Sequence, residues 1–437
     1  MLLYETYEGR FQKVKTLKEI YQANEELNYI DSSLYSRYRV KAGLRNDNGT
    51  GVKVGLTKIC DVIGYKFVHE KKYNIDGQLI YRGYPINYLV DKQPKDHIFG
   101  FEEVAFLLIF GTLPTEEQLQ EFKDYLLNFK MGPVDLQYET PNILNALQIE
   151  VLKLYAKDPS ADTDDLEERM MKGLNILASI PLFTFSYARN KVFKSYPYPD
   201  KSLAENILCM ARGNDQYTFE EARILDTLLM VHADHGGGNN STFANVVISS
   251  TGTDIYSCIS AAIGSLKGPK HGGANCKVTN MFKAIFHEVG FTTDKLTLKK
   301  IANRLLDKDF FDHSGLIYGI GHAIYTKSDP RALLIQQQCE MLAKSKGQED
   351  IYNCIHAFEK VAVEVMKERK GIDVCANVDY YSGYVYSLLG IENDLFTPLF
   401  AISRTAGWVS HHLENRQSNR KLIRPANVYV GEMEENK

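Results

Sequence analysis

Apolar residues recur every three to four positions through most of the chain, which is the spacing of one face of an α-helix. This periodicity predicts helices over residues 101–111, 115–128, 220–235, 257–266, 276–289, 296–306, 332–343, 351–366, 378–389 and 395–414. Strand-like and helix-like segments do not alternate along the chain, so a parallel α/β sheet is disfavoured. The pattern therefore predicts an all-α fold.

Local signals mark where several of these helices begin and end. Thr115 and Gln118 have the spacing of a capping box, and Thr218 and Glu221 repeat that spacing before the segment 220–235. Gly111 closes the segment that starts at residue 101, as glycine commonly does at a helix end. These signals predict the limits of three helices.

One short β element interrupts the helical pattern. We expect a β-hairpin near residues 65–82, where Asp76-Gly77 suits a two-residue turn. Residues 1–60 differ from the rest of the chain: they begin with a charged amphipathic segment, 11–29, which predicts a helix, and continue with a glycine-dotted stretch. No long linker is present, so any second domain is contiguous with the first through short turns.

Composition narrows the class of protein. The 437 residues are 44% hydrophobic and 24% charged, so a sizeable core can form. The net charge of −4 lacks the excess of positive charge that is typical of proteins that bind nucleic acid. The seven cysteines are scattered and never form C-x-x-C, which is typical of free thiols in a reducing compartment. The first residues lack the pattern of a secretory signal, and the longest apolar run, from Val104, is about half of a membrane span. We therefore expect a cytoplasmic protein that does not cross a membrane.

Two histidines follow or precede glycines, where the backbone is open enough for a ligand to approach. His271 lies in LKGPKHGGAN, and His322 lies in YGIGHAIYTKSDPRA. Glycine permits both close approach and positive φ, so each histidine is a candidate for chemistry. For either one alone, a turn that contains a histidine by chance remains the alternative.

A second pair of histidines raises the question of a metal. His232 and His235 lie three apart in VHADHGGGNNST and could share a helix face. The H-E-x-x-H spacing of zinc proteases is absent, and no third ligand is obvious nearby, so we predict no metal site. The glycine run of this stretch fits neither a dinucleotide-binding fingerprint nor a P-loop.

One carboxylate and several arginines complete the set of candidates. Asp379 begins an aromatic-rich segment, where the helix dipole alone would favour an acid. Arg331 follows Asp-Pro, Arg404 lies in SRTAGW and Arg424 lies in LIRPANVYVG. Each of these side chains, taken alone, could be structural.

Taken together, these residue types suit carbon–carbon bond formation on a polyanionic acid. A carboxylate can remove a proton from a carbon next to a carbonyl, and a neutral histidine can stabilise the resulting enol by donating to its oxygen. A second histidine can polarise the electrophile, while arginines hold its carboxylates through their planar fork. No nucleophilic serine or cysteine, metal set or nicotinamide motif competes well.

Five ordered motifs resemble the citrate synthase family: GPKHGGAN, GIGHAIYTKSDPRA, NVDYYSG, SRTAGW and IRPANVYVG. HADHGGGNNST, YRGYPI and FGTLPTEEQL also look like that family, so the resemblance covers about residues 60–431. It implies a two-domain helical fold, an acyltransferase of the si type, and the reaction that brings acetyl-CoA into the tricarboxylic acid cycle.

The resemblance also implies roles for individual residues. Asp379 matches the base that takes a methyl proton from acetyl-CoA, His271 the residue that polarises the thioester carbonyl, and His322 the residue that protonates the oxaloacetate carbonyl. Residues that match contacts to oxaloacetate and citrate are His235, Arg331, Arg404 and Arg424. Residues that match contacts to CoA are Ile317, Gly319, Gly321 and Lys327. Acetyl-CoA is a substrate, and no cofactor or metal is expected.

By the same resemblance the protein is expected to be a homodimer with two domains. A large domain would comprise residues 1–274 and 389–437, and a small domain, 275–388, would close over the substrates. Residues 1–60 match the family weakly and form an extension without an assigned role. Arg424 would reach the site of the partner subunit. Lys270 and Thr326 depart from the family pattern: many members have an apolar residue at the first position, and some have an arginine at the second.

Two other functions remain open at this point. A 2-methylcitrate synthase would use propionyl-CoA instead of acetyl-CoA, a difference of one methylene that is worth only about 1–3 kcal/mol in a pocket. An inactive binding protein descended from the enzyme would be expected to have lost one of His271, His322 or Asp379, and all three are present.

Overall fold

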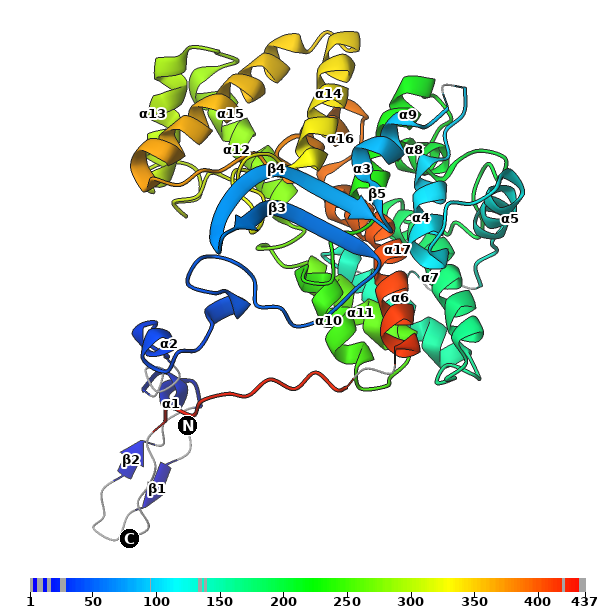
Figure 1. Ribbon diagram of the computed structural model, residues 1–437, viewed down its shortest axis with the longest axis horizontal. Helices are drawn as coiled ribbons and strands as arrows, with labels where there is room; N and C mark the ends of the chain where they lie inside the picture. Colours follow the sequence, from blue (N-terminus) through cyan, green and yellow to red (C-terminus); the bar gives the residue numbers. More distant parts are fainter. Residues whose placement is uncertain are drawn as a thin grey trace. The chain divides into compact units, whose positions relative to one another are not determined.

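The computed structural model describes residues 3–5, 11–13, 17–23, 29–94, 96–132, 136, 140–418 and 421–431. The chain divides into two compact units, one formed by Met1–Val54 with Arg424–Lys437 and the other by Gly55–Ile423. The described part is mostly helical, with two small antiparallel sheets (Figure 1). The predicted all-α class is therefore confirmed.

The first unit begins with a short strand pair. Strand β1 (Leu3–Glu5) pairs with β2 (Phe11–Lys13), and the helical elements α1 (Leu17–Ala23), α2 (Ser33–Arg37) and η2 (Ala42–Leu44) follow. The predicted helix over 11–29 is thus wrong at Phe11–Lys13, because the neighbouring strand satisfies this backbone and tertiary pairing overrides local periodicity. It is confirmed over Leu17–Ala23, and residues 24–28 lie outside the described residues.

The second unit contains the predicted hairpin. Strands β3 (Cys60–Val68), β4 (Lys71–Tyr81) and β5 (Tyr84–Pro85) form an antiparallel sheet in that order. The turn lies at His69 and Glu70, whose φ values are 46° and 62°, and not at Asp76-Gly77. Two consecutive left-handed residues give the twist that a two-residue hairpin requires. Asp76 and Gly77 lie inside β4, so the predicted turn position is wrong.

Helices make up most of the second unit. They are α3 (Ile86–Asp91), α4 (Gly100–Phe110), α5 (Glu116–Leu127), α6 (Ile143–Lys157), α7 (Leu166–Ala188), α8 (Leu203–Arg212), α9 (Phe219–His232), α10 (Asn240–Ser249), α11 (Ile255–Leu266), α12 (Ala274–Val289), α13 (Lys295–Leu306), α14 (Pro330–Ser345), α15 (Glu349–Lys370), α16 (Asp379–Leu388), the 3-10 turn η3 (Asn393–Leu395) and α17 (Phe396–Gln417). Both predicted capping boxes are present at α5 and α9, and Gly111 ends α4 with φ 90°.

Helix α17 forms the centre of this unit. It packs against α4, α7, α9, α10 and α11, and its first seventeen residues are all buried. The side chains of Arg404 and Trp408 are fully buried there. A guanidinium in such a position needs partners, because an unpaired buried charge is costly. The core therefore holds the guanidinium of Arg404 at a fixed position on α17.

A second group of helices, α12 to α16, packs mainly among itself: α13 and α14 lie against α15, and α12 and α14 lie against α16 (Figure 1). These helices fall within the predicted small domain, 275–388, but its boundaries against the predicted large domain remain a prediction. None of the described helices has the length and apolar character needed to cross a membrane. All seven cysteines are free thiols, and only Cys276 is not buried.

Candidate functional site

The side chain of Asn377 joins the chain segments that carry His322 and Asp379. Its Nδ2 donates to the carbonyl oxygen of Gly321 (2.9 Å), and its Oδ1 accepts from the backbone N–H of Asp379 (3.0 Å). The backbone N–H of Gly321 also donates to the carbonyl of Cys375 at 2.8 Å. These bonds hold the residue just before His322 beside the start of α16. The catalytic histidine and acid predicted from distant motifs are therefore brought together.

His271 lies in the glycine-rich bend between α11 and α12. Its Nε2 accepts the backbone N–H of Ser241 at 3.3 Å and lies 3.1 Å from the Ser241 Oγ. Burial, followed by the charge of Arg404, lowers the pKa of His271 to about 4. The ring is therefore neutral at ordinary pH, and because Nε2 is an acceptor, the proton resides on Nδ1. His271 is set up as a neutral hydrogen-bond donor.

His322 is held in the opposite tautomer. Its Nδ1 accepts the backbone N–H groups of Ile324 and Tyr325, both at 3.1 Å. With Nδ1 an acceptor, the neutral ring carries its proton on Nε2. The ring stacks on Tyr325 with centroids 4.7 Å apart and meets His235 edge-on at 5.0 Å. The Nε2–H is thus the hydrogen-bond donor of the His322 ring.

Asp379 begins α16 and has a buried carboxylate oxygen. Its Oδ1 has no hydrogen-bond partner among the described residues. Burial raises the pKa of Asp379 to about 7, although the charges of Arg331 and Arg404 act in the opposite direction. A carboxyl with a pKa near neutrality can both accept and release a proton at working pH. Asp379 therefore has the properties of a general base.

Two buried arginines lie near this acid, and their environments differ. Arg404 donates from Nε to the backbone carbonyl of His232 (2.7 Å), and its buried Nη1 and Nη2 have no partner among the described residues. Arg331 is paired with Asp329, through Nε to Oδ1 (3.0 Å) and Nη2 to Oδ2 (2.7 Å). Arg404 therefore presents Nη1 and Nη2 to an anion, whereas Nε and Nη2 of Arg331 are already bonded to Asp329.

His235 and His232 are both buried and neutral. Burial, then the charges of Arg331 and Arg404, lower the pKa of each, to about 3 for His232 and well below the usual range for His235. The Nε2 atom of each has no partner among the described residues, and the Nδ1 of His232 bonds to the carbonyl of Leu228 at 2.7 Å. No cluster of three metal-ligating side chains occurs in the described part of the chain. The two rings instead supply polar nitrogens near the arginines.

Three of the four predicted CoA contacts, Ile317, Gly319 and Gly321, lie on the loop before His322. Gly319 and Gly321 have φ values of 81° and 101°, which only glycine adopts without strain, and Ile317 is buried. The loop pairs with the segment before Asp379 through an isolated bridge between Ile320 and Ala376.

One residue predicted to contact substrate is not brought into the cluster. Lys327 lies at the surface, where its Nζ pairs with Asp76 at 3.0 Å. Arg424 belongs to the other compact unit, so its predicted contact with a carboxylate stays a prediction.

Sequence reasoning missed the residues that hold the predicted ones in place. Asn377, Ser241, Tyr325 and Asp329 each bond to a residue of the cluster or to its neighbouring backbone. All four stand inside the quoted motifs, and that was the only signal in the sequence. Two of these bonds, Asn377 to Gly321 and Ser241 to His271, join segments 56 and 30 residues apart, and only the fold identifies such partners.

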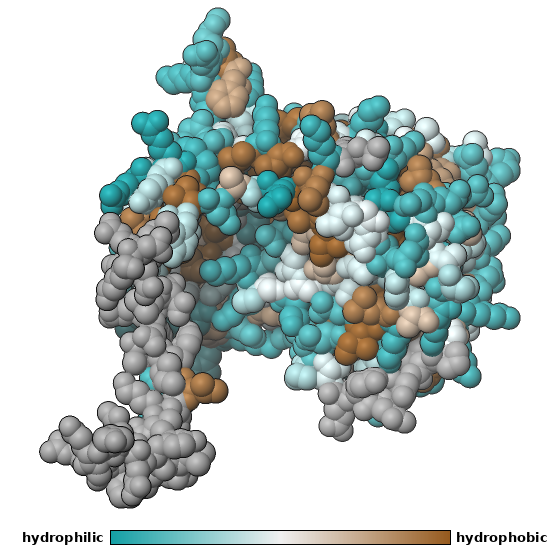
Figure 2. Space-filling model, turned by 90° about the horizontal axis from the view of Figure 1, so that it is seen from below, coloured by the Kyte–Doolittle hydropathy of each residue, from teal (hydrophilic) through white to brown (hydrophobic). Residues whose placement is uncertain are grey.

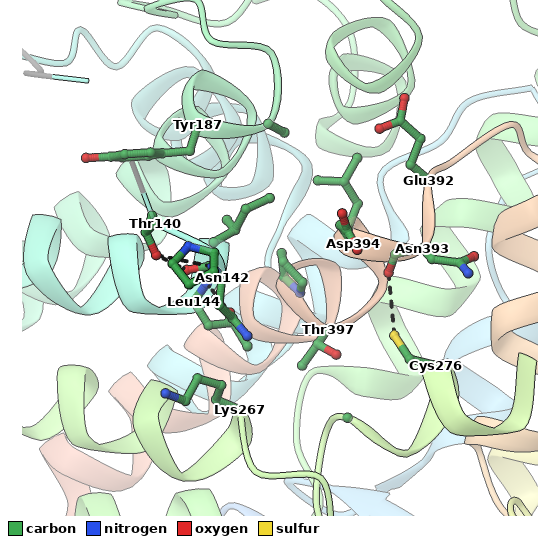
Figure 3. A pocket seen from close by; sticks show the side chains of 16 residues that line it. Thr140, Asn142, Leu144, Tyr187, Lys267, Cys276, Glu392, Asn393, Asp394 and Thr397 are labelled. Carbon is green, nitrogen blue, oxygen red and sulfur yellow. Dashed lines mark hydrogen bonds between the residues drawn. The ribbon is translucent and has the colours of Figure 1, made fainter. Parts of the chain in front are cut away.

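A cavity of about 380 Å³ adjoins the bend that carries His271 (Figure 3). Lys267 and Gly273, on either side of the bend, line it together with Thr397, whose Oγ1 donates to the carbonyl of Gly272 at 3.1 Å. Cys276 also lines it and bonds through Sγ to the carbonyl of Asn393. None of the predicted catalytic residues faces this cavity, so it is distinct from the cluster.

The chain was compared with known families, sequences and structures. The family model "Citrate synthase, C-terminal domain" matches residues 46–426. A citrate synthase of Haloferax volcanii is 38% identical, with 82% of this chain and 90% of that protein covered. A 2-methylcitrate synthase of Corynebacterium glutamicum is 34% identical, with coverage of 81% and 89%.

Solved structures agree with the sequence relatives. The citrate synthase of Thermotoga maritima superposes with a TM-score of 0.72 at 29% identity, covering 91% of this chain and 98% of that one. A ternary complex of the Thermoplasma acidophilum citrate synthase with carboxymethyl coenzyme A and oxaloacetate gives 0.71 at 26% identity, with the same coverage. Fold, family model and relatives thus coincide: the chain belongs to the citrate synthase family, with the function of a citrate synthase, an acyltransferase.

Proposed function

We propose that the cluster of His271, His322 and Asp379 condenses acetyl-CoA with oxaloacetate and then hydrolyses the citryl-CoA formed, releasing citrate and CoA. One observation carries this proposal. Buried polar atoms of Arg404, His235 and Asp379 have no protein partner among the described residues, and such atoms are normally satisfied. An anionic ligand that offers several oxygens would satisfy the donors, while the Asp379 oxygen suits a proton that is transferred.

Each proton transfer of the condensation can be assigned to a named atom. The Asp379 carboxylate removes a methyl proton of acetyl-CoA, while the Nδ1–H of His271 donates to the thioester oxygen and stabilises the enol. The enol carbon attacks the ketone carbon of oxaloacetate, and the Nε2–H of His322 protonates the ketone oxygen as it becomes a hydroxyl. These side chains account for the condensation, so we propose that it needs no metal or organic cofactor.

The remaining predicted residues bind the substrates. The Nη atoms of Arg404 and the Nε2 of His235, which have no partner among the described residues, are proposed to contact the oxaloacetate carboxylates, together with Arg331 beside its partner Asp329. Ile317, Gly319 and Gly321 are proposed to meet CoA, since their loop lies directly before His322. Lys327 is proposed to contact a CoA phosphate, which requires its ammonium to leave Asp76.

We propose a homodimer, in which Arg424 completes the site of the partner subunit. Helix α6 exposes Ile149, Leu152 and Tyr155, each more than a third accessible and spaced to share one side of the helix. Hydrophobic residues also gather in patches on the face shown in Figure 2. A second copy is the natural cover for such a face. A cytoplasmic location is proposed because seven free thiols suit a reducing compartment.

The test is release of CoA from acetyl-CoA, with and without oxaloacetate. Oxaloacetate-dependent release is expected, and its absence in folded protein would overturn the proposal. Because Cys276 is partly accessible to a thiol reagent, loss of thioester absorbance should be followed in parallel, with Cys276→Ser as the control. Propionyl-CoA is the second substrate to test, since a 2-methylcitrate synthase is among the relatives. A higher kcat/KM with propionyl-CoA would assign that activity instead.

A further inference from the structure

Two glycines of the hairpin lie where the loop after His322 presses against the sheet. A Cβ on Gly64 of β3 would stand 2.4 Å from the carbonyl oxygen of Ile324. A Cβ on Gly77 of β4 would stand 2.2 Å from the carbonyl oxygen of Ser328 and 2.6 Å from Cδ1 of Tyr325. Neither glycine has a positive φ. Glycine is therefore required at these positions for space, and the glycine that suggested a turn serves close packing instead.

Polar bonds join the same two parts of the chain. The N–H of Gly77 donates to the Oγ of Ser328 at 3.1 Å, and the hydroxyl of Tyr325 donates to the carbonyl of Gln78 at 3.2 Å. The Lys327–Asp76 ion pair lies beside them, although it is exposed and adds little. The loop is thus fastened to strand β4 by backbone, side-chain and steric contacts at consecutive residues.

Tyr325 connects this fastening to His322. It is fully buried, its N–H donates to the Nδ1 of His322, and its ring stacks on the imidazole with an interplanar angle of 23°. Tyr325 thus holds the ring plane of His322 and, together with the N–H of Ile324, keeps Nδ1 an acceptor. A shift of Tyr325 would turn the Nε2–H donor away from its target.

We propose that the β3–β4 hairpin is a positioning element for His322, acting through Tyr325 and through the close approach at Gly64 and Gly77. The proposal rests on the proposed role of His322 as the donor to the oxaloacetate carbonyl. The hairpin contacts no substrate in this account. It holds a loop, and a displacement of about 1 Å at a reacting group can cost roughly 100-fold in rate.

Three variants test the proposal. Gly77→Ala adds one methyl against Ser328 and Tyr325, and Tyr325→Phe removes only the hydroxyl that bonds to Gln78. The matched control is Gly55→Ala, since a Cβ at Gly55 meets nothing within 4 Å and its φ is not positive. Melting temperatures establish that each variant is folded.

The informative measurements are the infrared carbonyl stretch of bound ¹³C-labelled oxaloacetate and the separate kinetic constants for the two substrates. Hydrogen-bond donation to a carbonyl lowers its stretching frequency, so the shift on binding reports how well Nε2–H is aimed. We expect Gly77→Ala to lose much of the shift and about 100-fold in kcat, and Tyr325→Phe to lose several-fold. KM for acetyl-CoA should change less than kcat, because the link from the hairpin to a residue proposed to contact CoA, the Lys327–Asp76 pair, is exposed and weak.

His322→Ala separates the two proposals. If this variant keeps the wild-type carbonyl shift, the role of His322 itself is wrong. If it loses the shift while folded Gly77→Ala and Tyr325→Phe keep it and the wild-type kcat, the role of His322 stands and the positioning role of the hairpin is overturned. If Gly77→Ala or Tyr325→Phe has a lower melting temperature but an unchanged carbonyl shift, the hairpin stabilises the fold and does not position His322.

Discussion

The guanidinium of Arg404 is anchored by the backbone carbonyl of His232, to which its Nε donates at 2.7 Å, and both of its buried Nη atoms have no partner among the described residues. The Nε–H orients the guanidinium, and the N–H groups of Nη1 and Nη2 are left for a ligand in the cluster. Arg331 differs, since Asp329 takes two of its donors. Arg404 is therefore the arginine best prepared to bind a carboxylate.

Replacing Arg404 with lysine should weaken oxaloacetate binding strongly. The ammonium keeps the charge but loses the fork and the bond to His232, so KM for oxaloacetate is expected to rise by about 10- to 100-fold, corresponding to roughly 1.4–2.7 kcal/mol. Steady-state kinetics at saturating acetyl-CoA measure this. Arg169→Lys is the matched control, because Arg169 is equally buried but bonds to Asp164 and Thr253. A similar KM in both variants would remove Arg404 from the binding site.

The pH dependence of kcat/KM should report Asp379. The base must be ionised, and burial raises its pKa to about 7, so activity is expected to rise with pH and to reach half its maximum near pH 7. His271, with a pKa of about 4, stays neutral over this range and does not contribute to the rise. Asp379→Asn should lose about 100- to 10,000-fold in kcat. A wild-type midpoint below pH 5.5 would contradict the assignment.

Ser241→Ala should cost more stability than activity. The backbone N–H that bonds to His271 remains, so kcat is expected to fall less than about tenfold. The indole N–H of Trp408, which donates to Ser241 Oγ at 3.2 Å, loses its partner, at a cost of about 1–3 kcal/mol. Trp408 is the single tryptophan, so its fluorescence follows unfolding directly. A large fall in kcat with unchanged stability would show that the hydroxyl itself acts on His271.

Stability should decline as pH rises because of two buried carboxyls in the core. Burial raises the pKa of Glu102 to about 8, with a contribution from Asp226, and burial raises that of Asp226 to about 7. The unfolded state releases these protons near the ordinary pKa values, whereas the folded state keeps that of Asp226 up to about pH 7 and that of Glu102 up to about pH 8. The free energy of unfolding therefore falls as pH rises through this window.

Glu102→Gln should reduce this decline. The amide Oε1 can still accept the N–H of Leu203, and no charge develops at alkaline pH. Melting curves at pH 5.5 and pH 8 measure the effect, with Glu116→Gln at the α5 surface as the control. An equal decline in wild type and Glu102→Gln would place the titrating group elsewhere.

Arg424 can be tested by complementation between subunits. If it acts on the partner's site, Arg424→Ala and His271→Ala should each be nearly inactive alone, but co-expressed subunits should regain activity, because mixed dimers contain one site with both residues intact. Size-exclusion chromatography of each variant shows whether the dimer persists. Activity that stays absent in verified mixed dimers would assign Arg424 to its own subunit or to no site.

The helices and the identity of the reactive residues could be predicted from the sequence. Apolar periodicity and capping residues are local signals, so α4 and α5 begin and end at or next to the expected positions. Helix α9 begins next to its expected start but ends at His232, three residues before its expected end. The reactive side chains stand in motifs whose order and residue types are readable along the chain. Where local backbone is paired by a distant strand, as at Phe11–Lys13, the same periodicity was misleading.

Only the tertiary structure decided which partners the reactive residues bond to and which protonation states they have. The turn expected at Asp76-Gly77 lies instead at His69 and Glu70, and Gly77 serves close packing against a segment about 250 residues away. The tautomer of His271 depends on Ser241 from another segment, and the raised pKa of Asp379 depends on burial. The tautomer of His322 and the pairing of Arg331 with Asp329 depend on how their own loop folds back on itself. Desolvation and hydrogen bonding act through space, and a linear sequence records which residues exist but not which of them meet.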